Sequence, residues 1–206
     1  MNEILPFAFA IYPLLISGAA LIWMFAFGYQ SRINRVVVVL ACGSMIMFAF
    51  LAGAWAFTSY YLRYAFLGLF VVFAGFLFFR AKQESPYAWA DDGKVAVLPI
   101  AVFLLFAVLN ALAIAAHYPS TKTLDANFPL RDGTYYVLQG GDSVVTNPFH
   151  AMSGNKTAID IVKLNWLGNR ADGIAPRALS AYEIFGETLY SPCQGRVSKV
   201  RNRMPD

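Results

Sequence analysis

Four long apolar stretches fill residues 1–118, and a polar sequence rich in turn-forming residues fills residues 119–206. A helix of about 20 apolar residues is long enough to cross the hydrocarbon layer of a membrane. The stretches therefore predict four membrane-spanning helices, at about residues 4–28, 36–57, 61–79 and 95–116. The expected fold is an α-helical membrane anchor that carries a small, incomplete antiparallel all-β domain outside the cytoplasm.

Two polar side chains within these stretches change the picture. Arg63 lies near the start of the third stretch, which reaches spanning length only if its guanidinium extends to the membrane surface. Asn110 lies at membrane depth in the fourth stretch, where its amide needs a hydrogen-bond partner on another helix. The interiors of the stretches hold no other ionisable group, so we expect the helices to anchor or assemble a protein. This disfavours a transporter or channel subunit.

Basic residues predict the side of the membrane on which each connection lies, because Lys and Arg are enriched in cytoplasmic loops. The first and third connections carry the basic residues Arg32, Arg35, Arg80, Lys82 and Lys94. The second connection offers only Arg63, so it is predicted to lie outside the cytoplasm, as are both termini and residues 119–206. The chain is then a multi-pass protein of the plasma (inner) membrane. Its first stretch lacks a basic leader and is expected to remain as an uncleaved anchor.

Composition supports the membrane assignment. Hydrophobic residues make up 58% of the chain and charged residues 14%, whereas about a quarter of the residues of a soluble protein are charged. The lipid bilayer is therefore an expected partner. Residues 119–206 carry ten Lys and Arg against eight Asp and Glu, which is too balanced for nucleic-acid binding. A basic cluster near the end is either one solvated face or a contact with anionic lipid or cell-wall polymer: Arg196, Lys199, Arg201 and Arg203.

The two cysteines are not expected to form a disulfide with each other. Cys42 lies within the second apolar stretch and Cys193 in the polar tail, too far apart for the geometry of a bridge. Cys42 is predicted to be a packing residue. Cys193 is either a free thiol or the partner of a cysteine in another chain.

The tail is typical of β structure. Short runs of β-prone residues, separated by Gly and Pro, predict strands at Gly133–Leu138, Ser143–Thr146, Ala158–Leu164, Glu187–Tyr190 and Arg196–Val200. The first two runs flank Gly140 and Gly141 and predict a hairpin. So few brief strands make a small layer, which is expected to need a further part or a partner to close its core.

Several segments of the tail resemble a known family. Residues 185–197, with the sequence FGETLYSPCQGRV, look like the G-x-x-V-x-A-P-x-x-G-x-V segment of lysostaphin-type zinc endopeptidases, which cut peptidoglycan cross-bridges. Residues 136–141, His150 and the Ala158-Ile159-Asp160 run resemble the opening of membrane-attached members of that group, as do Phe128-Pro129-Leu130 and Asn147. The resemblance covers about residues 126–206.

The resemblance implies a zinc site. Enzymes of this type hold zinc with two histidines and an aspartate, and the metal activates a water molecule for attack on the amide. Asp160 matches the aspartate ligand, although a turn or strand-end role is the alternative. The family's first histidine lies four residues earlier, where this chain has Lys156, and a lysine ammonium cannot bind a metal. His150 is the remaining candidate, with an uninvolved loop histidine as the alternative.

Two function hypotheses follow. The family's H-x-H motif belongs downstream of residues 185–197, and the sequence has no histidine after His150. The first hypothesis is a membrane-anchored peptidoglycan metalloendopeptidase, seen as a fragment or as a form that has lost its chemistry. The second is a non-catalytic subunit of a membrane complex, whose outer domain binds cell-wall polymer or a protein partner. No nucleotide cofactor is expected, because Gly140-Gly141 lacks the spacing of a phosphate-binding loop.

Overall fold

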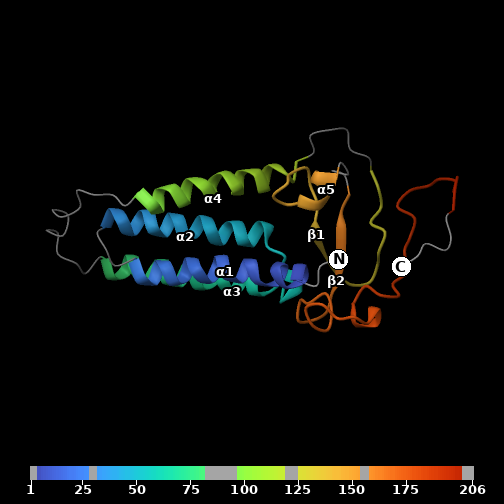
Figure 1. Ribbon diagram of the computed structural model, residues 1–206, viewed down its shortest axis with the longest axis horizontal. Helices are drawn as coiled ribbons and strands as arrows, with labels where there is room; N and C mark the ends of the chain where they lie inside the picture. The colour runs from blue at the N-terminus through green and yellow to red at the C-terminus, as the bar shows by residue number, and fades with distance from the viewer. Residues whose placement is uncertain (1–3, 28–31, 82–96, 119–124, 154–157, 201–206) are drawn as a thin grey trace.

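A bundle of four helices with a small β unit at one end makes up the protein (Figure 1). The computed structural model describes residues 4–27, 32–81, 97–118, 125–153 and 158–200. Its long helices are α1 (Ile4–Phe27), α2 (Arg32–Ala52), α3 (Leu62–Ala81) and α4 (Val97–Ala115). All four are long and apolar enough to cross a membrane, and within the described ranges their number and approximate positions agree with the four apolar stretches.

The predicted end of the second helix, near residue 57, is wrong. Helix α2 ends at Ala52 and a separate turn of 3-10 helix, η1 (Trp55–Phe57), follows it. The Tyr12 hydroxyl donates a hydrogen bond to the carbonyl of Ala52 and accepts one from the backbone N–H of Ala54 at 3.0 Å. A side chain of α1 therefore replaces the backbone hydrogen bonds that would continue α2. The hydropathy of the sequence does not predict such a contact.

Helix α2 lies at the centre of the bundle and packs against α1, α3 and α4. Its buried side chains form the main core with residues of α1 and α3: Ala20, Met24, Val38, Val39, Cys42, Ile46 and Leu77. Cys42 is fully buried there, as predicted, and Cys42 and Cys193 form no disulfide. Asn110 Nδ2 donates a hydrogen bond to the Ser44 carbonyl at 2.9 Å, so the predicted partner on another helix is confirmed.

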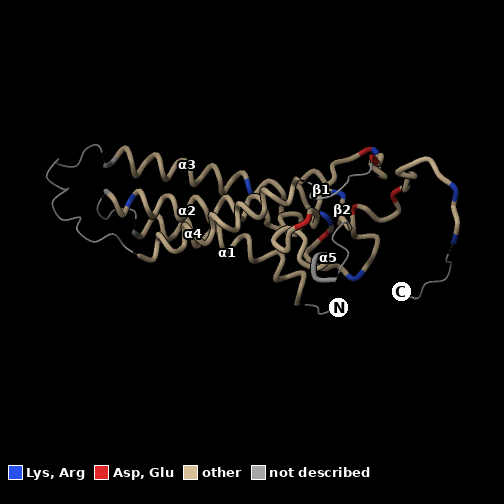
Figure 2. Tube along the Cα trace, turned by 90° about the horizontal axis from the view of Figure 1, so that it is seen from above, with Lys and Arg blue, Asp and Glu red and all other residues tan. Residues whose placement is uncertain are grey.

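The outer surface of the bundle is apolar. Large hydrophobic side chains of α3 and α4 are exposed along their length, including Val71, Val72, Phe79, Leu104, Leu105 and Val108. Figure 2 shows Lys, Arg, Asp and Glu mainly near the ends of the bundle and in the β unit. Arg63 lies at the first turn of α3, where its guanidinium donates hydrogen bonds to the hydroxyls of Tyr60 (3.0 Å) and Tyr64 (2.9 Å). Such a surface is compatible with a multi-pass membrane protein.

The described sheet has two strands, β1 (Thr134–Gln139) and β2 (Asp160–Leu164), paired antiparallel. The predicted hairpin within residues 133–146 is wrong, because Ser143–Thr146 forms turns and the partner of β1 is β2. A short helix, α5 (Pro148–Ser153), lies between the two strands in the sequence.

The last two predicted strands are also not formed. Residues 187–190 and 196–200 have no strand conformation, although the chain there is extended enough to pair locally with an earlier segment. The N–H of Tyr190 donates a hydrogen bond to the Pro129 carbonyl at 2.8 Å, and the N–H of Asn127 donates one to the Pro192 carbonyl at 2.7 Å. Both carbonyl acceptors belong to prolines, which lack the N–H that a regular ladder needs, so the pairing stays irregular.

The β unit is docked directly on the helix ends. It lies where α1 and α3 begin and where α2 and α4 end (Figure 1), so these helix ends and the tail lie at the same end of the bundle. Four hydrogen bonds tie the tail to the connection between α2 and α3. They are Tyr136 Oη to Gly53 O (2.7 Å), Tyr60 N to Gly168 O (2.9 Å), Ser59 Oγ to Leu167 O (2.6 Å) and Arg170 N to Ala56 O (3.0 Å).

This junction has a small core of its own. Ala10 of α1, Ala54 and Phe57 are buried, and Leu138 of β1 and Ile174 pack against them. The helix ends thus provide the cover that a two-stranded sheet lacks, since an isolated pair of strands is at best marginally stable in water.

Candidate functional site

The two predicted metal ligands lie side by side. His150 is on α5 and Asp160 is the first residue of β2. His150 Nε2 lies 3.0 Å from Asp160 Oδ1, and the side chains are 23% and 44% exposed. The turns before α5 fold the chain back so that its short helix lies beside the start of β2. Lys156, at the family's usual histidine position, lies outside the described residues.

Two amides hold the α5 segment beside the sheet. Asn147 is fully buried, and its Nδ2 donates hydrogen bonds to the carbonyls of Gly141 (3.0 Å) and Ala158 (3.1 Å). The first bond closes the turn after β1, and the second ties α5 to the entry of β2. Gln139, at the end of β1, accepts a hydrogen bond from the Phe149 N–H at 3.4 Å. The position of His150 is therefore fixed by buried amide groups rather than by sequence proximity to Asp160.

The pair meets part of the requirement of a catalytic zinc site. Imidazole nitrogen and carboxylate oxygen are both zinc ligands, and two ligand atoms about 2.0–2.2 Å from a tetrahedral ion are roughly 3.3–3.6 Å apart. His150 Nε2 and Asp160 Oδ1 are 3.0 Å apart, a hydrogen-bond distance just below that range, so the pair would have to open slightly to hold an ion. A catalytic site uses three protein ligands, and among the described residues no His, Cys, Asp or Glu joins the pair as a third. His150 and Asp160 thus fit two of the three positions.

Asp160 also lines a cavity of about 570 Å³ between the start of α1 and the β unit. Its lining residues come from α1, η1, the β unit and the segment after β2: Leu5, Pro6, Phe7, Phe9, Phe57, Gln139, Phe149, Asp160, Arg170, Ala175, Arg177 and Tyr182. Arg170 is the buried cation of this wall and is only 9% exposed. We did not identify it from the sequence, because one arginine in a polar tail is indistinguishable from a solvated residue.

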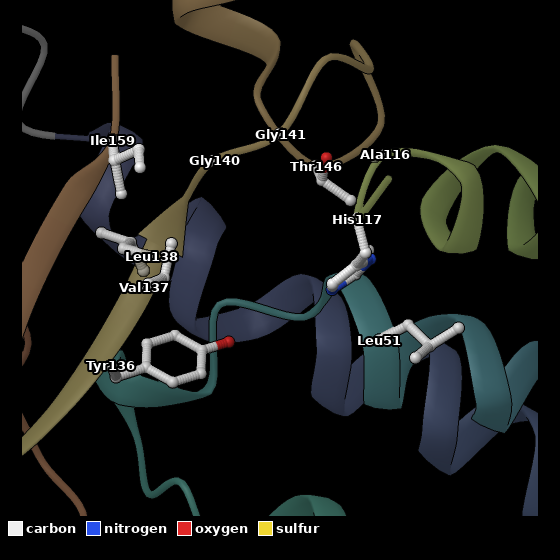
Figure 3. A pocket seen from close by; sticks show the side chains of 11 residues that line it. Leu51, Ala116, His117, Tyr136, Val137, Leu138, Gly140, Gly141, Thr146 and Ile159 are labelled. Atoms are coloured by element: carbon white, nitrogen blue, oxygen red, sulfur yellow. The ribbon is translucent and has the colours of Figure 1, made fainter. Parts of the chain in front are cut away.

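A second cavity, of about 390 Å³, lies between the ends of α2 and α4 and the first strand (Figure 3). Leu51 and His117 line its helical side, and Tyr136 and Val137 line the side of β1. The His117 ring nitrogen Nδ1 lies 2.8 Å from the Ala113 carbonyl. Burial raises the pKa of Tyr136 well above its ordinary value, so its phenol stays protonated and remains a hydrogen-bond donor at neutral pH. This cavity shares no lining residue with the first.

No protein-family model, curated protein or solved structure matches the chain. The fold defines a helical bundle of membrane-spanning dimensions that carries a small β unit at one end. Its candidate chemistry is concentrated at the junction of the two parts, where Asp160, His150 and Arg170 lie.

Proposed function

We propose that this chain is the membrane-anchoring part of a lysostaphin-type peptidoglycan metalloendopeptidase, with His150 and Asp160 as two ligands of its zinc ion. The observation that carries the proposal is the 3.0 Å contact between their side chains, which are separated by ten residues. The family resemblance of residues 126–206 singles out Asp160 independently of that contact. A third ligand has to come from residues outside the described set.

Bound zinc would polarise the scissile amide and supply a nucleophilic water. The residues of this chain would hold the ion between α5 and the start of β2. Asn147 would keep α5 against β2, so that His150 and Asp160 do not have to be ordered when the metal binds. Both side chains are partly exposed, which leaves room for a substrate strand to approach.

The test measures zinc in the natively isolated protein together with its intact mass. We expect about one zinc per chain by elemental analysis, and hydrolysis of purified peptidoglycan that a chelator abolishes. Asp160→Asn and His150→Gln should each lower zinc content and activity, because each removes a ligand. Asp172→Asn is the matched control, since this exposed aspartate undergoes the same change away from the pair.

The intact mass separates a longer natural protein from the present chain of 22.8 kDa. A natively isolated protein that holds no zinc, or variants that retain all of it, would refute the peptidase proposal.

A second function, a non-catalytic subunit of a membrane complex that binds cell-wall polymer, is favoured by a different observation. The described residues supply two metal donors, and the β unit is bound to the helix ends by backbone hydrogen bonds at Tyr60 and Arg170. A rigidly docked unit suits presentation of a binding surface. Co-sedimentation of the zinc-free protein with purified peptidoglycan would support this function, and the same variants of His150 and Asp160 should then leave sedimentation unchanged. Absence of both zinc and sedimentation would exclude it.

A further inference from the structure

The cavity beside α1 has two chemically different walls. One wall is formed by apolar side chains from the first turns of α1, from η1 and from α5: Leu5, Pro6, Phe7, Phe9, Phe57 and Phe149. The other wall is formed by polar and charged groups of the β unit and of the segment after β2. The volume of about 570 Å³ lies within the range of small-molecule sites, roughly 300–1,000 Å³. A ligand that fills this cavity therefore has both an apolar and a polar part.

Arg170 is a buried cation that has no carboxylate partner among the described residues. Its Nη2 donates to the Ile174 carbonyl at 2.7 Å, and its guanidinium lies 3.9 Å from the centre of the Phe57 ring and 5.1 Å from that of Tyr182. Its Nε is buried and has no hydrogen-bond acceptor in the described structure. Burial of a charge without a counter-ion is unfavourable, so an anion that enters this cavity would be stabilised.

Two further charged residues line the cavity with Arg170. They are Arg177, which is exposed, and Asp160. The Asp160 carboxylate is already engaged by His150 at 3.0 Å. The negatively charged group of a ligand is therefore expected at Arg170.

The place of the cavity in the fold indicates the source of the ligand. Its apolar wall begins in the first turn of α1, and the candidate span of that helix runs over Ile4–Ala26. The cavity therefore lies at the level where a membrane-spanning helix emerges from the bilayer, which is where lipid phosphates are located. Phe7 and Phe149 are nearly half exposed, at 46% and 45%, and continue the apolar surface out of the cavity.

We propose that this cavity binds one anionic phospholipid of the surrounding membrane, with its phosphate on Arg170 and the start of one acyl chain along the wall formed by α1 and Phe149. Guanidinium groups bind phosphate through charge-assisted hydrogen bonds, and the apolar wall binds the hydrocarbon. The bound lipid would tie the β unit to the bilayer beside the His150–Asp160 pair. The inference does not depend on zinc, because the pair contributes only the carboxylate of Asp160 to the cavity.

Native mass spectrometry of the full chain in detergent tests the proposal, with phosphatidylglycerol, phosphatidylcholine and inorganic phosphate added separately. We expect one phosphatidylglycerol to be retained per chain in preference to phosphatidylcholine. Arg170→Gln should weaken this retention by about tenfold or more, the least expected from removal of a charge-assisted contact. Arg131→Gln is the matched control, because it removes the same charge from an exposed arginine that stacks on Tyr190.

A second variant covers the case in which Arg170→Gln disturbs folding. Ala175→Trp places an indole in the cavity from an exposed position and leaves every charged group in place. It should also weaken lipid retention by about tenfold or more. Equal loss in the Arg170 and Arg131 variants would overturn the proposal, as would full retention in the Ala175 variant. So would retention of inorganic phosphate as strong as that of phosphatidylglycerol, because the acyl chain would then contribute nothing.

Discussion

Gly168 is the position at which the docking of the β unit on the helices can be tested most directly. Its φ is +79°, and a Cβ atom at this position would lie 2.9 Å from the backbone nitrogen of Tyr60 and 3.0 Å from the Tyr60 Cβ. The same Tyr60 N–H donates a hydrogen bond to the Gly168 carbonyl at 2.9 Å. Gly168→Ala therefore cannot relieve the close contact by separating the two segments without stretching the bond that joins them.

The magnitude follows from two contributions. A left-handed backbone costs an L-residue about 1–2 kcal/mol. Loss of the hydrogen bond between Tyr60 and Gly168 adds about 0.5–1.5 kcal/mol. Gly168→Ala should therefore lower the free energy of docking by roughly 1.5–3.5 kcal/mol. Gly173→Ala is the matched control, because Gly173 has a φ of +94° with nothing within 4 Å of the added Cβ, so only the backbone contribution remains.

Hydrogen–deuterium exchange of the protein in detergent micelles measures the difference. Peptides that contain the amides of Tyr60 and Arg170 report opening of the junction, since both amides donate across it. We expect exchange there to be about three- to tenfold faster in Gly168→Ala than in Gly173→Ala. Equal exchange in the two variants would refute the reasoning, because the close approach to Tyr60 would then carry no energy.

Three further predictions concern single contacts. Tyr136→Phe removes the hydrogen bond from the tail to the connection after α2. It should lower the free energy of unfolding, measured by thermal unfolding, by about 0.5–1.5 kcal/mol. Asn110→Leu should change stability in detergent by less than about 1 kcal/mol, because a hydrogen bond between membrane helices averages about 0.6 kcal/mol and leucine also removes the buried, unpaired Oδ1. The hydrogen bond that Lys163 donates to the Glu187 carboxylate raises the pKa of Lys163, so this contact should persist through neutral pH and weaken as pH rises above the ordinary lysine value of about 10.4. Fluorescence anisotropy of a probe on the exposed Cys193 should fall over that pH range.

Each of these predictions has a result that contradicts it. An unfolding free energy unchanged by Tyr136→Phe would mean that the phenol contributes only through its ring. A loss of several kcal/mol in Asn110→Leu would show that the amide organises the bundle more widely than one bond. Because the pKa of Lys163 is raised in the folded protein, its contact with Glu187 stabilises the fold at pH values below the lysine pKa of the unfolded chain. This stabilisation is lost as pH rises through the pKa of Lys163 in the folded protein. Lys163→Met should abolish the anisotropy change, and its persistence would assign the change to another group.

The sequence predicted the helices well because their stability in a membrane depends on length and hydropathy, both of which are local. The four long helices were located to within a few residues, and the main error, at the end of α2, arose from one contact, between Tyr12 and the carbonyl of Ala52. Asn110 was correctly assigned a partner because an amide in an apolar environment requires one. The identity of that partner, the carbonyl of Ser44, depends on packing and was not predictable.

The β unit was predicted less well because its pairing is non-local. Propensity identified β1 and β2, yet the hairpin rule selected Ser143–Thr146 as the partner of β1. The buried Asn147 instead holds that segment in turns, and no short-range pattern reports burial of one amide. Residues 126–206 retain their resemblance to lysostaphin-type enzymes as a prediction. The resemblance named His150 and Asp160 as candidate ligands, whereas no sequence pattern singled out Arg170.

The junction also sets an order of events during synthesis. The surface that receives the tail consists of residues 53–60, and the segments that bind it, at Tyr136 and at residues 167–170, leave the ribosome more than 70 residues later. The helix ends that receive the tail are therefore made before it, and the bundle serves as a template for the last part of the chain. A fault in helix packing would then appear first as a tail open to proteases, far from the altered residue.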